Sequence, residues 1–194
     1  MADMLRLERR DCHGDLSLNL PELSISLRKN TGIGMVQKSQ PVSDDQVIAF
    51  NKEASFSLPL QSCRVVKDEQ GGEICSISPT MWFVQTDYEK INSYIQQINT
   101  LGHDRSIIAT NMSDQIVCLE VSGTRAIEFF SKGCSLDFRK NTFPVGHSAR
   151  SLLGQANVVF NHIDVNKYHL LLDISLLDYL WKWMRETSLE FTFG

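Results

Sequence analysis

The sequence predicts an α+β fold with mostly antiparallel sheets. Short apolar segments with the period of strands are interspersed with segments of helical period. The connections lack the long crossovers that a parallel sheet requires. The chain has 194 residues, of which 42% are hydrophobic and 22% charged. This is the composition of a globular protein with room for one ordinary domain or two small intertwined ones.

Charge and cysteine content exclude several classes of protein. Nineteen Lys and Arg against 23 Asp and Glu give a formal net charge of −4, which excludes a strongly basic nucleic-acid-binding surface. The five cysteines are irregularly spaced without a CxxC pair, which predicts reduced thiols. The N-terminal segment lacks the apolar core of a secretory signal, and no stretch approaches the roughly 18 apolar residues of a membrane span. We therefore expect a cytoplasmic protein that binds neither nucleic acid nor membrane.

Residues 1–56 are expected to form N-terminal strands and a loop or arm, ahead of a compact body at 57–194. Apolar and polar residues alternate at 16–20 and again at 25–27, which predicts two half-buried strands. Residues 30–45 contain two glycines, a proline and two aspartates, which predicts a loop or a mobile arm.

That stretch includes a GxG motif at Gly32 and Gly34, of the kind that lets a backbone approach phosphate. Gln37 stands where the third glycine of a dinucleotide-binding loop belongs, and no apolar strand leads into the motif. We therefore interpret the motif as a flexible loop and expect no nucleotide there.

A helix at 88–102 is the clearest element in the middle of the chain. Apolar side chains recur along it at helical spacing, Thr86 and Glu89 form a capping box, and Gly102 supplies a stop. Three strands are expected ahead of this helix, at 60–66, 73–77 and 81–84.

The sequence from residue 107 to residue 172 predicts a short helix and five strands. The helix at 124–132 ends at Gly133 and is expected to bury Ile127, Phe129 and Phe130. The strands are expected at 107–109, 116–121, 149–153, 156–163 and 168–172, with a hairpin closed at Gly154.

His162 and His169 are candidate metal ligands. If residues 164–167 form the turn, the two side chains lie opposite each other with Cβ atoms about 5 Å apart. Two ligands do not complete a metal site, and the sequence places no cysteine or carboxylate beside them. The alternative is a solvated polar face of a hairpin, and we expect no metal.

No set of residues assembles a nucleophile, a base and an orienting group. Cys134 follows a helix C-terminus, where the helix dipole disfavours a thiolate. Asp137, Arg139 and Lys140 are most simply a solvated turn. We therefore expect no catalytic and no cofactor-binding residue.

One long segment, residues 117–184, resembles the gamma subunit of heterotetrameric sarcosine oxidase. The order and spacing of several short motifs carry the resemblance, which covers about the last 120 residues and is weak over 1–60. The motifs are the strand ending in Ser122-Gly123, Gly133-Cys134-Ser135-Leu136-Asp137, Phe143-Pro144-Val145-Gly146, Ala149-Arg150-Ser151-Leu152-Leu153-Gly154, Leu180-Trp181-Lys182-Trp183 and, further upstream, Ser78-Pro79 through Trp82.

The resemblance implies a fold related to the folate-binding domain of aminomethyltransferases, in which small α/β units interleave. It also implies a complex that demethylates sarcosine to glycine and passes the one-carbon unit to tetrahydrofolate. In that family the alpha and beta subunits hold the flavins and NAD, a small delta subunit carries zinc, and the gamma chain has no redox cofactor and no assigned catalytic residue.

Folate-using relatives place a carboxylate shortly after the glycine of this hairpin, where this chain has Gln155, Ala156 and Asn157 after Gly154. None of these can serve as an acid or base near neutral pH, so we expect no folate chemistry here, while binding of folate without chemistry stays an open alternative. The alternatives are the equivalent subunit of a related N-methyl amino acid dehydrogenase, a stand-alone folate-binding or aminomethyltransferase-like protein, and an adaptor unrelated to amine oxidation.

The C-terminal helix, from a capping box at Ser175 and Asp178 to about Thr187, predicts a partner surface. At about 100° per residue its apolar arc spans roughly 220°, about twice what its own core needs. Tyr179 and Trp183 lie outside the core stripe and are candidates for a contact with the large subunit. The alternative is that loops of the same chain cover them. The stripe itself contains Leu177, Leu180, Trp181 and Met184.

Overall fold

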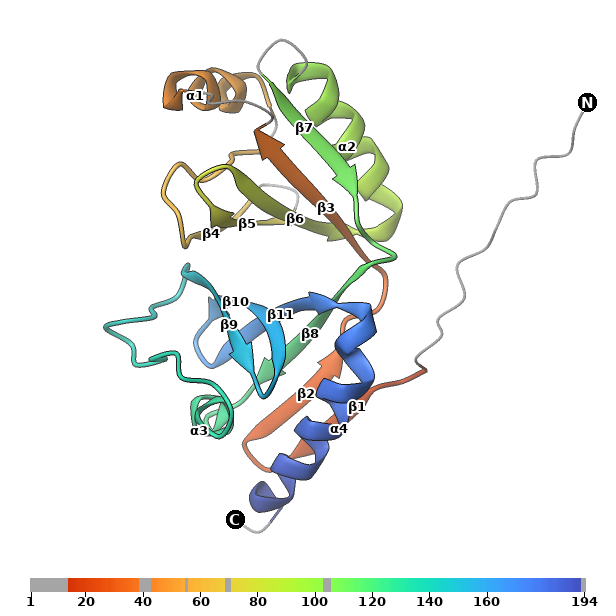
Figure 1. Ribbon diagram of the computed structural model, residues 1–194, viewed down its shortest axis with the longest axis vertical. Helices are drawn as coiled ribbons and strands as arrows, with labels where there is room; N and C mark the ends of the chain where they lie inside the picture. Colours follow the sequence, from red (N-terminus) through yellow and green to blue (C-terminus); the bar gives the residue numbers. More distant parts are fainter. Residues whose placement is uncertain (1–13, 39–42, 55, 69–70, 103–105, 193–194) are drawn as a thin grey trace, which may run out of the picture.

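The computed structural model describes residues 14–38, 43–54, 56–68, 71–102 and 106–192 (Figure 1). Two antiparallel sheets pack against each other, and helices cover the outer side of each sheet. The helices are α1 (Asp44–Glu53), α2 (Tyr88–Gly102), α3 (Ala126–Ser131) and α4 (Leu177–Ser188), with short 3₁₀ turns η2 (Ile174–Leu176) and η3 (Leu189–Phe191).

Every recorded strand pair is antiparallel, which confirms the predicted α+β class. The six-stranded sheet has the order β1 (Ser17–Leu20), β2 (Leu23–Leu27), β8 (Ile116–Ser122), β11 (Lys167–Asp173), β10 (Ala156–Asp164), β9 (Ser148–Leu153). The five-stranded sheet has the order β4 (Val65–Lys67), β5 (Glu73–Ser78), β6 (Met81–Asp87), β3 (Thr31–Lys38), β7 (Ile107–Asn111).

Three hydrophobic clusters follow from the alternation of side chains along the strands. The outer face of the six-stranded sheet packs under α3 and α4 in an aromatic-rich core that includes Phe130, Phe160 and Tyr168. The outer face of the five-stranded sheet packs under α1 and α2 around Trp82. Inner-facing residues of both sheets form the third cluster, which is Ile33, Val65, Cys75, Cys118, Val159, Ile163 and Leu171.

The expectation of a loop or mobile arm at 30–45 is wrong. Residues 31–38 form β3, which lies between β6 and β7, and α1 begins at Asp44; residues 39–42 lie outside the described part of the chain. The glycines serve packing. A Cβ on Gly32 would lie 2.6 Å from Cβ of Ile91 in α2, so only glycine lets the helix pack this closely on the strand. Because β1, β2 and β3 all belong to the sheets, the compact fold begins before residue 57.

The periodic elements are confirmed, whereas several of their boundaries differ. The strand expected at 60–66 begins only at Val65. Thr86 does not cap α2, because it lies within β6 opposite Gly32. The turn before α4 is capped by Asp173, which accepts a hydrogen bond from Ser175 N at 2.9 Å, so the capping box expected at Ser175 is wrong.

The helix α3 buries Phe129 and Phe130 as expected. Its Ile127 is 37% exposed, so the expectation that this residue is buried is wrong. The hairpin of β9 and β10 is confirmed, and Gly154 closes it with φ +59°, a conformation that favours glycine.

Candidate functional site

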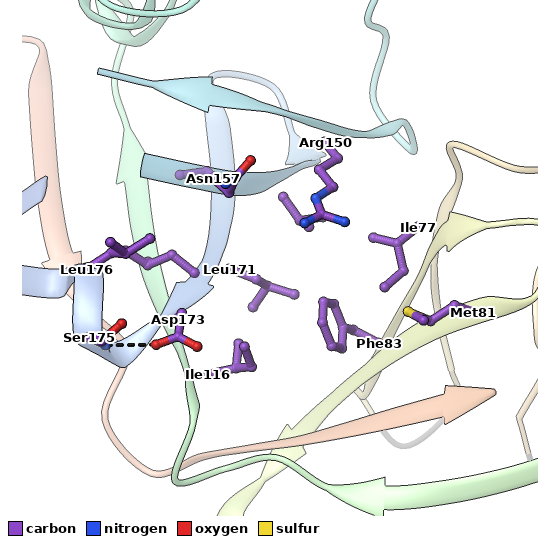
Figure 2. Close-up of a pocket in the computed structure, with 13 residues that line it drawn as sticks. Ile77, Met81, Phe83, Ile116, Arg150, Asn157, Leu171, Asp173, Ser175 and Leu176 are labelled. Carbon is purple, nitrogen blue, oxygen red and sulfur yellow. Dashed lines mark hydrogen bonds between the residues drawn. The ribbon is translucent and has the colours of Figure 1, made fainter. Parts of the chain in front are cut away.

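A pocket opens between the two sheets at one edge of their inner layer (Figure 2). Its volume is about 410 Å³, which is in the range of small-molecule sites. We call it the inter-sheet pocket. Its lining residues are Ile77, Met81, Phe83, Ile116, Arg150, Asn157, Val158, Val159, Leu171, Leu172, Asp173, Ser175 and Leu176.

Most of the pocket wall is apolar, because it is built from inner-facing residues of six strands, β5, β6 and β8 to β11. Leu171 and Val159 close it on the six-stranded sheet and are 1% and 6% exposed. Phe83 and Ile77 face them from the five-stranded sheet and are only partly buried (Figure 2). The two sheets thus supply opposite walls of one apolar slot.

The polar groups of the pocket lie on opposite sides of the hollow (Figure 2). Arg150 reaches over it from β9, where it pairs with Val159 and is a diagonal neighbour of Asn157 on β10. Within the described part of the chain, the Arg150 side chain makes no hydrogen bond and no ion pair. On the other side, Asp173 accepts from Ser175 N at 2.9 Å and from Gln115 Nε2 at 3.3 Å. The hydrogen bonds from Ser175, aided by Gln115, lower the pKa of Asp173.

A second polar group in the inner layer is a buried charge network of Glu73, His169, Glu120, Arg28 and Lys167. His169 Nδ1 lies 2.6 Å from Glu73 Oε2, and its Nε2 lies 3.1 Å from Glu120 Oε2. Lys167 Nζ lies 2.9 Å from Glu120, and Arg28 Nη1 lies 3.8 Å from Glu73. Arg28 Nη1 also lies 3.1 Å from His169 Nδ1, so this ring nitrogen contacts both a guanidinium and a carboxylate.

Burial by itself would raise the pKa of Glu120, but hydrogen bonds and charge from Lys167 and His169 outweigh it and lower the pKa. Glu73 belongs to the five-stranded sheet, whereas His169 and Glu120 belong to the other sheet. The buried charge network therefore links the two sheets directly. Glu73, His169 and Glu120 lie four positions along the same strands from pocket residues Ile77, Asp173 and Ile116, about 13 Å away.

The candidate metal pair is wrong, because the two histidines point to opposite faces of the sheet. A register shift between His162 and Asp164 places His162 opposite Tyr168, and places Asn161 opposite His169. His162 stacks on Tyr168 at 4.4 Å between ring centroids, on the helix side. Within the described residues, no three His, Cys, Asp or Glu side chains are grouped so as to hold a metal.

The remaining candidate residues have structural surroundings. Cys134 Sγ lies 3.5 Å from Ser151 Oγ, and no histidine of the described segments is a hydrogen-bond partner of this thiol. Arg139 makes a bidentate contact with Asp137, which lowers the pKa of that carboxyl, and the Arg139 side chain is 83% exposed, as expected for a solvated turn. Desolvation raises the pKa of Cys75 to about 11 and that of Cys118 to about 12, so these inner-layer thiols are protonated at neutral pH.

Tyr179 and Trp183 lie on α4 over the β9–β10 turn. Tyr179 is 41% exposed, and its hydroxyl accepts a hydrogen bond from Gln155 N at 3.0 Å. Trp183 is partly buried, with its ring centroid 5.7 Å from that of Phe129. A Cβ on Gly133 would lie 2.4 Å from Trp183 Cζ2, so this glycine makes room for the indole. The core stripe of α4 is confirmed for Leu177, Leu180 and Met184, which are buried, while Trp181 is partly buried.

Sequence reasoning missed the inter-sheet pocket and the buried charge network. A usable signal existed on β5, where Glu73 shares the inner face with Cys75 and Ile77. A carboxylate on an otherwise apolar face of a strand predicts a buried partner. The sequence did not reveal that this partner is His169, 96 residues away.

Comparison with known proteins gives one family and two informative structures. A family model described as sarcosine oxidase, gamma subunit family, matches residues 44–190. No curated protein sequence matches the chain. The described residues contain no helix long and apolar enough to cross a membrane.

Among solved structures, the chain is similar to a heterotetrameric sarcosine oxidase from Corynebacterium sp. U-96 in complex with pyrrole 2-carboxylate. The TM-score is 0.80 at 14% identity, over 92% of this chain and 90% of that one. It is also similar to the glycine cleavage system aminomethyltransferase T from Bartonella henselae, with a TM-score of 0.60 at 9% identity, over 85% of this chain and 46% of that one. The chain thus spans about half of that aminomethyltransferase, and the likeness establishes the interleaved α+β fold.

Proposed function

The chain belongs to the sarcosine oxidase gamma subunit family, and on that premise we propose that it is a non-catalytic subunit that stabilises an oxidase complex by docking on the large subunit. The observation that carries the proposal is the family match over residues 44–190. The similarity in fold to a chain of a heterotetrameric sarcosine oxidase, over nine-tenths of both chains, supports it.

In this proposal the chemistry belongs to the partners. The complex demethylates sarcosine, or another N-methylated amino acid, oxidatively, and transfers the one-carbon unit to tetrahydrofolate. The flavins and NAD are held by the alpha and beta subunits, zinc by the small delta subunit, and folate by a partner rather than by this chain. The gamma chain contributes a folded surface that holds the partners in place.

We place the docking surface on α4 and the β9–β10 turn, around Tyr179 and Trp183. Tyr179 combines 41% exposure with a hydroxyl fixed by Gln155 N, so its ring is a rigid and partly apolar anchor. Such aromatic residues are enriched as binding anchors in protein interfaces. Trp183 contributes both to this surface and to the core, through Phe129, so its replacement affects folding as well as assembly.

The test is co-expression with the partner subunits, followed by affinity purification through the large subunit. Tyr179→Ala is expected to weaken recovery of the gamma chain by about 2 kcal/mol, roughly thirtyfold in the dissociation constant. The matched control is Ile108→Ala, on β7 of the other sheet, where a side chain 51% exposed is truncated. Recovery of Tyr179→Ala equal to that of the control would contradict the docking surface.

Measurements on the purified chain test the non-catalytic role. We expect neither a flavin absorption band nor sarcosine-dependent oxygen uptake from this chain alone, and either would contradict the proposal. Titration with tetrahydrofolate separates it from a stand-alone folate-dependent protein, for which saturable binding and turnover by this chain would be required.

A further inference from the structure

We propose that the inter-sheet pocket binds a small organic monocarboxylate with a flat or branched apolar body. The proposed site lies between the sheets, whereas the docking surface lies over the outer side of the six-stranded sheet. The binding site therefore does not depend on the assembly role.

The first step of the argument is the shape and polarity of the slot. The pocket has a volume of about 410 Å³, and Leu171 faces Phe83 and Ile77 across it (Figure 2). Val159, which pairs with Leu171, lines the same side as Leu171. Removing an apolar ligand body and the partly exposed side chains of Phe83 and Ile77 from water together is favourable. Two facing apolar walls, one of them with an aromatic ring, suit a flat or branched apolar group.

The second step is the guanidinium at the edge of the slot. Arg150 extends over the pocket and forms no hydrogen bond or ion pair with the rest of the described chain. A guanidinium presents a planar fork of donors that matches a carboxylate in a bidentate manner. The side-chain amide of Asn157, the diagonal neighbour of Arg150, is a second donor on the same face. A carboxylate at this end of the ligand would therefore be held by charge and by hydrogen bonds.

The third step fixes the number of charges on the ligand. Asp173 stands across the hollow from Arg150, and the hydrogen bonds from Ser175 and Gln115 keep it ionised at neutral pH (Figure 2). A second carboxylate at that end would meet a like charge, and the described residues that line this end include no cation. The pocket therefore selects a monocarboxylate over a dicarboxylate of the same shape, and orients the carboxylate toward Arg150.

The experiment is calorimetric titration of the full chain with three probes of one shape: 2-naphthoate, its neutral amide 2-naphthamide, and 2,6-naphthalenedicarboxylate. The expected result is saturable binding of 2-naphthoate at one site, with the amide and the diacid at least about tenfold weaker. Arg150→Gln is expected to weaken 2-naphthoate about tenfold and to leave the amide unchanged. Asp173→Asn keeps a capping side chain and is expected to improve binding of the diacid alone.

The matched control is Arg185→Gln, which removes an exposed guanidinium from α4 and should change none of the three affinities. Absence of saturable 2-naphthoate binding, or equal affinities for the acid in the Arg150→Gln and wild-type chains, would overturn the proposal. A further outcome assigns the pocket to a protein partner instead. In that case Arg150→Gln lowers recovery of the partner subunits, and the wild-type chain does not bind 2-naphthoate.

Discussion

Replacement of Glu73 by Gln tests whether the buried charge network holds the two sheets together. The substitution keeps the shape of the side chain and removes one of the two carboxylates that flank His169. The Glu73 side chain is 8% exposed and that of His169 is 3% exposed, and their closest contact is 2.6 Å. His169 would therefore lose its closest carboxylate and keep only its contact with the partly exposed Glu120. The change would also remove the ion pair of Glu73 with Arg28, whose atoms lie 3.8 Å apart.

The expected loss of stability depends on how deeply Glu73 and its partners are buried. Breaking a buried ion pair by removing one partner costs about 3–5 kcal/mol, because a charge is left without compensation, whereas exposed pairs contribute about 0–1 kcal/mol. For a chain of this length each kcal/mol lowers Tm by about 2–4 °C. We therefore expect Glu73→Gln to lower Tm by about 6–20 °C at neutral pH.

Differential scanning calorimetry of the purified chain measures this effect. The control is Asp137→Asn, which removes an equally short contact, to Arg139, on a surface turn where the arginine side chain is 83% exposed. That change should lower Tm by no more than a few degrees. If Glu73→Gln shifts Tm no further than the control, the network does not stabilise the packing of the sheets and the reasoning is refuted.

Two further predictions concern the close contact of α2 with β3 and the pH dependence of stability. Gly32→Ala places a Cβ 2.6 Å from that of Ile91 and should destabilise the fold by about 1–3 kcal/mol in urea unfolding; wild-type stability would show that the helix shifts freely. The pKa of Glu120 is lowered in the folded chain, so its contribution is present above its unfolded value of about 4.5 and is lost as pH falls below it. Urea unfolding between about pH 3 and pH 7 should show this loss in the wild-type chain and less of it in Glu120→Gln; equal pH slopes in the two would contradict the assignment.

The sequence predicts those elements whose side-chain period is uninterrupted. The helix α2 and the hairpin at Gly154 follow from local patterns alone, because their buried positions recur at 3.6 or 2 residues. The sequence analysis predicts a loop where β3 lies, because Gly32 and Gly34 are compatible both with a flexible loop and with a strand that packs closely under a helix. Glycines that mark a flexible loop and glycines that allow a helix to approach a strand are identical in sequence, and only the position of Ile91 in α2 distinguishes them.

The site was harder to predict than the fold, because its contacts join distant segments. The register of β10 and β11 shifts by one residue at Ile163, which moves His162 to the helix side and leaves His169 in the inner layer. A hairpin derived from turn residues alone cannot anticipate such a bulge. The pairing of Glu73 with His169 depends in addition on how two separate sheets pack, and no local pattern encodes that arrangement.

The inner layer between the sheets has two ends with different chemistry, and the strands connect them. On β5, β8 and β11 a network residue and a pocket residue share one face, four positions apart: Glu73 with Ile77, Glu120 with Ile116 and His169 with Asp173. Charge–charge contacts fix the spacing of the sheets at one end, and the other end opens as an apolar slot whose walls come one from each sheet. The ionic contacts that join the two sheets thus lie about 13 Å along the strands from the inter-sheet pocket.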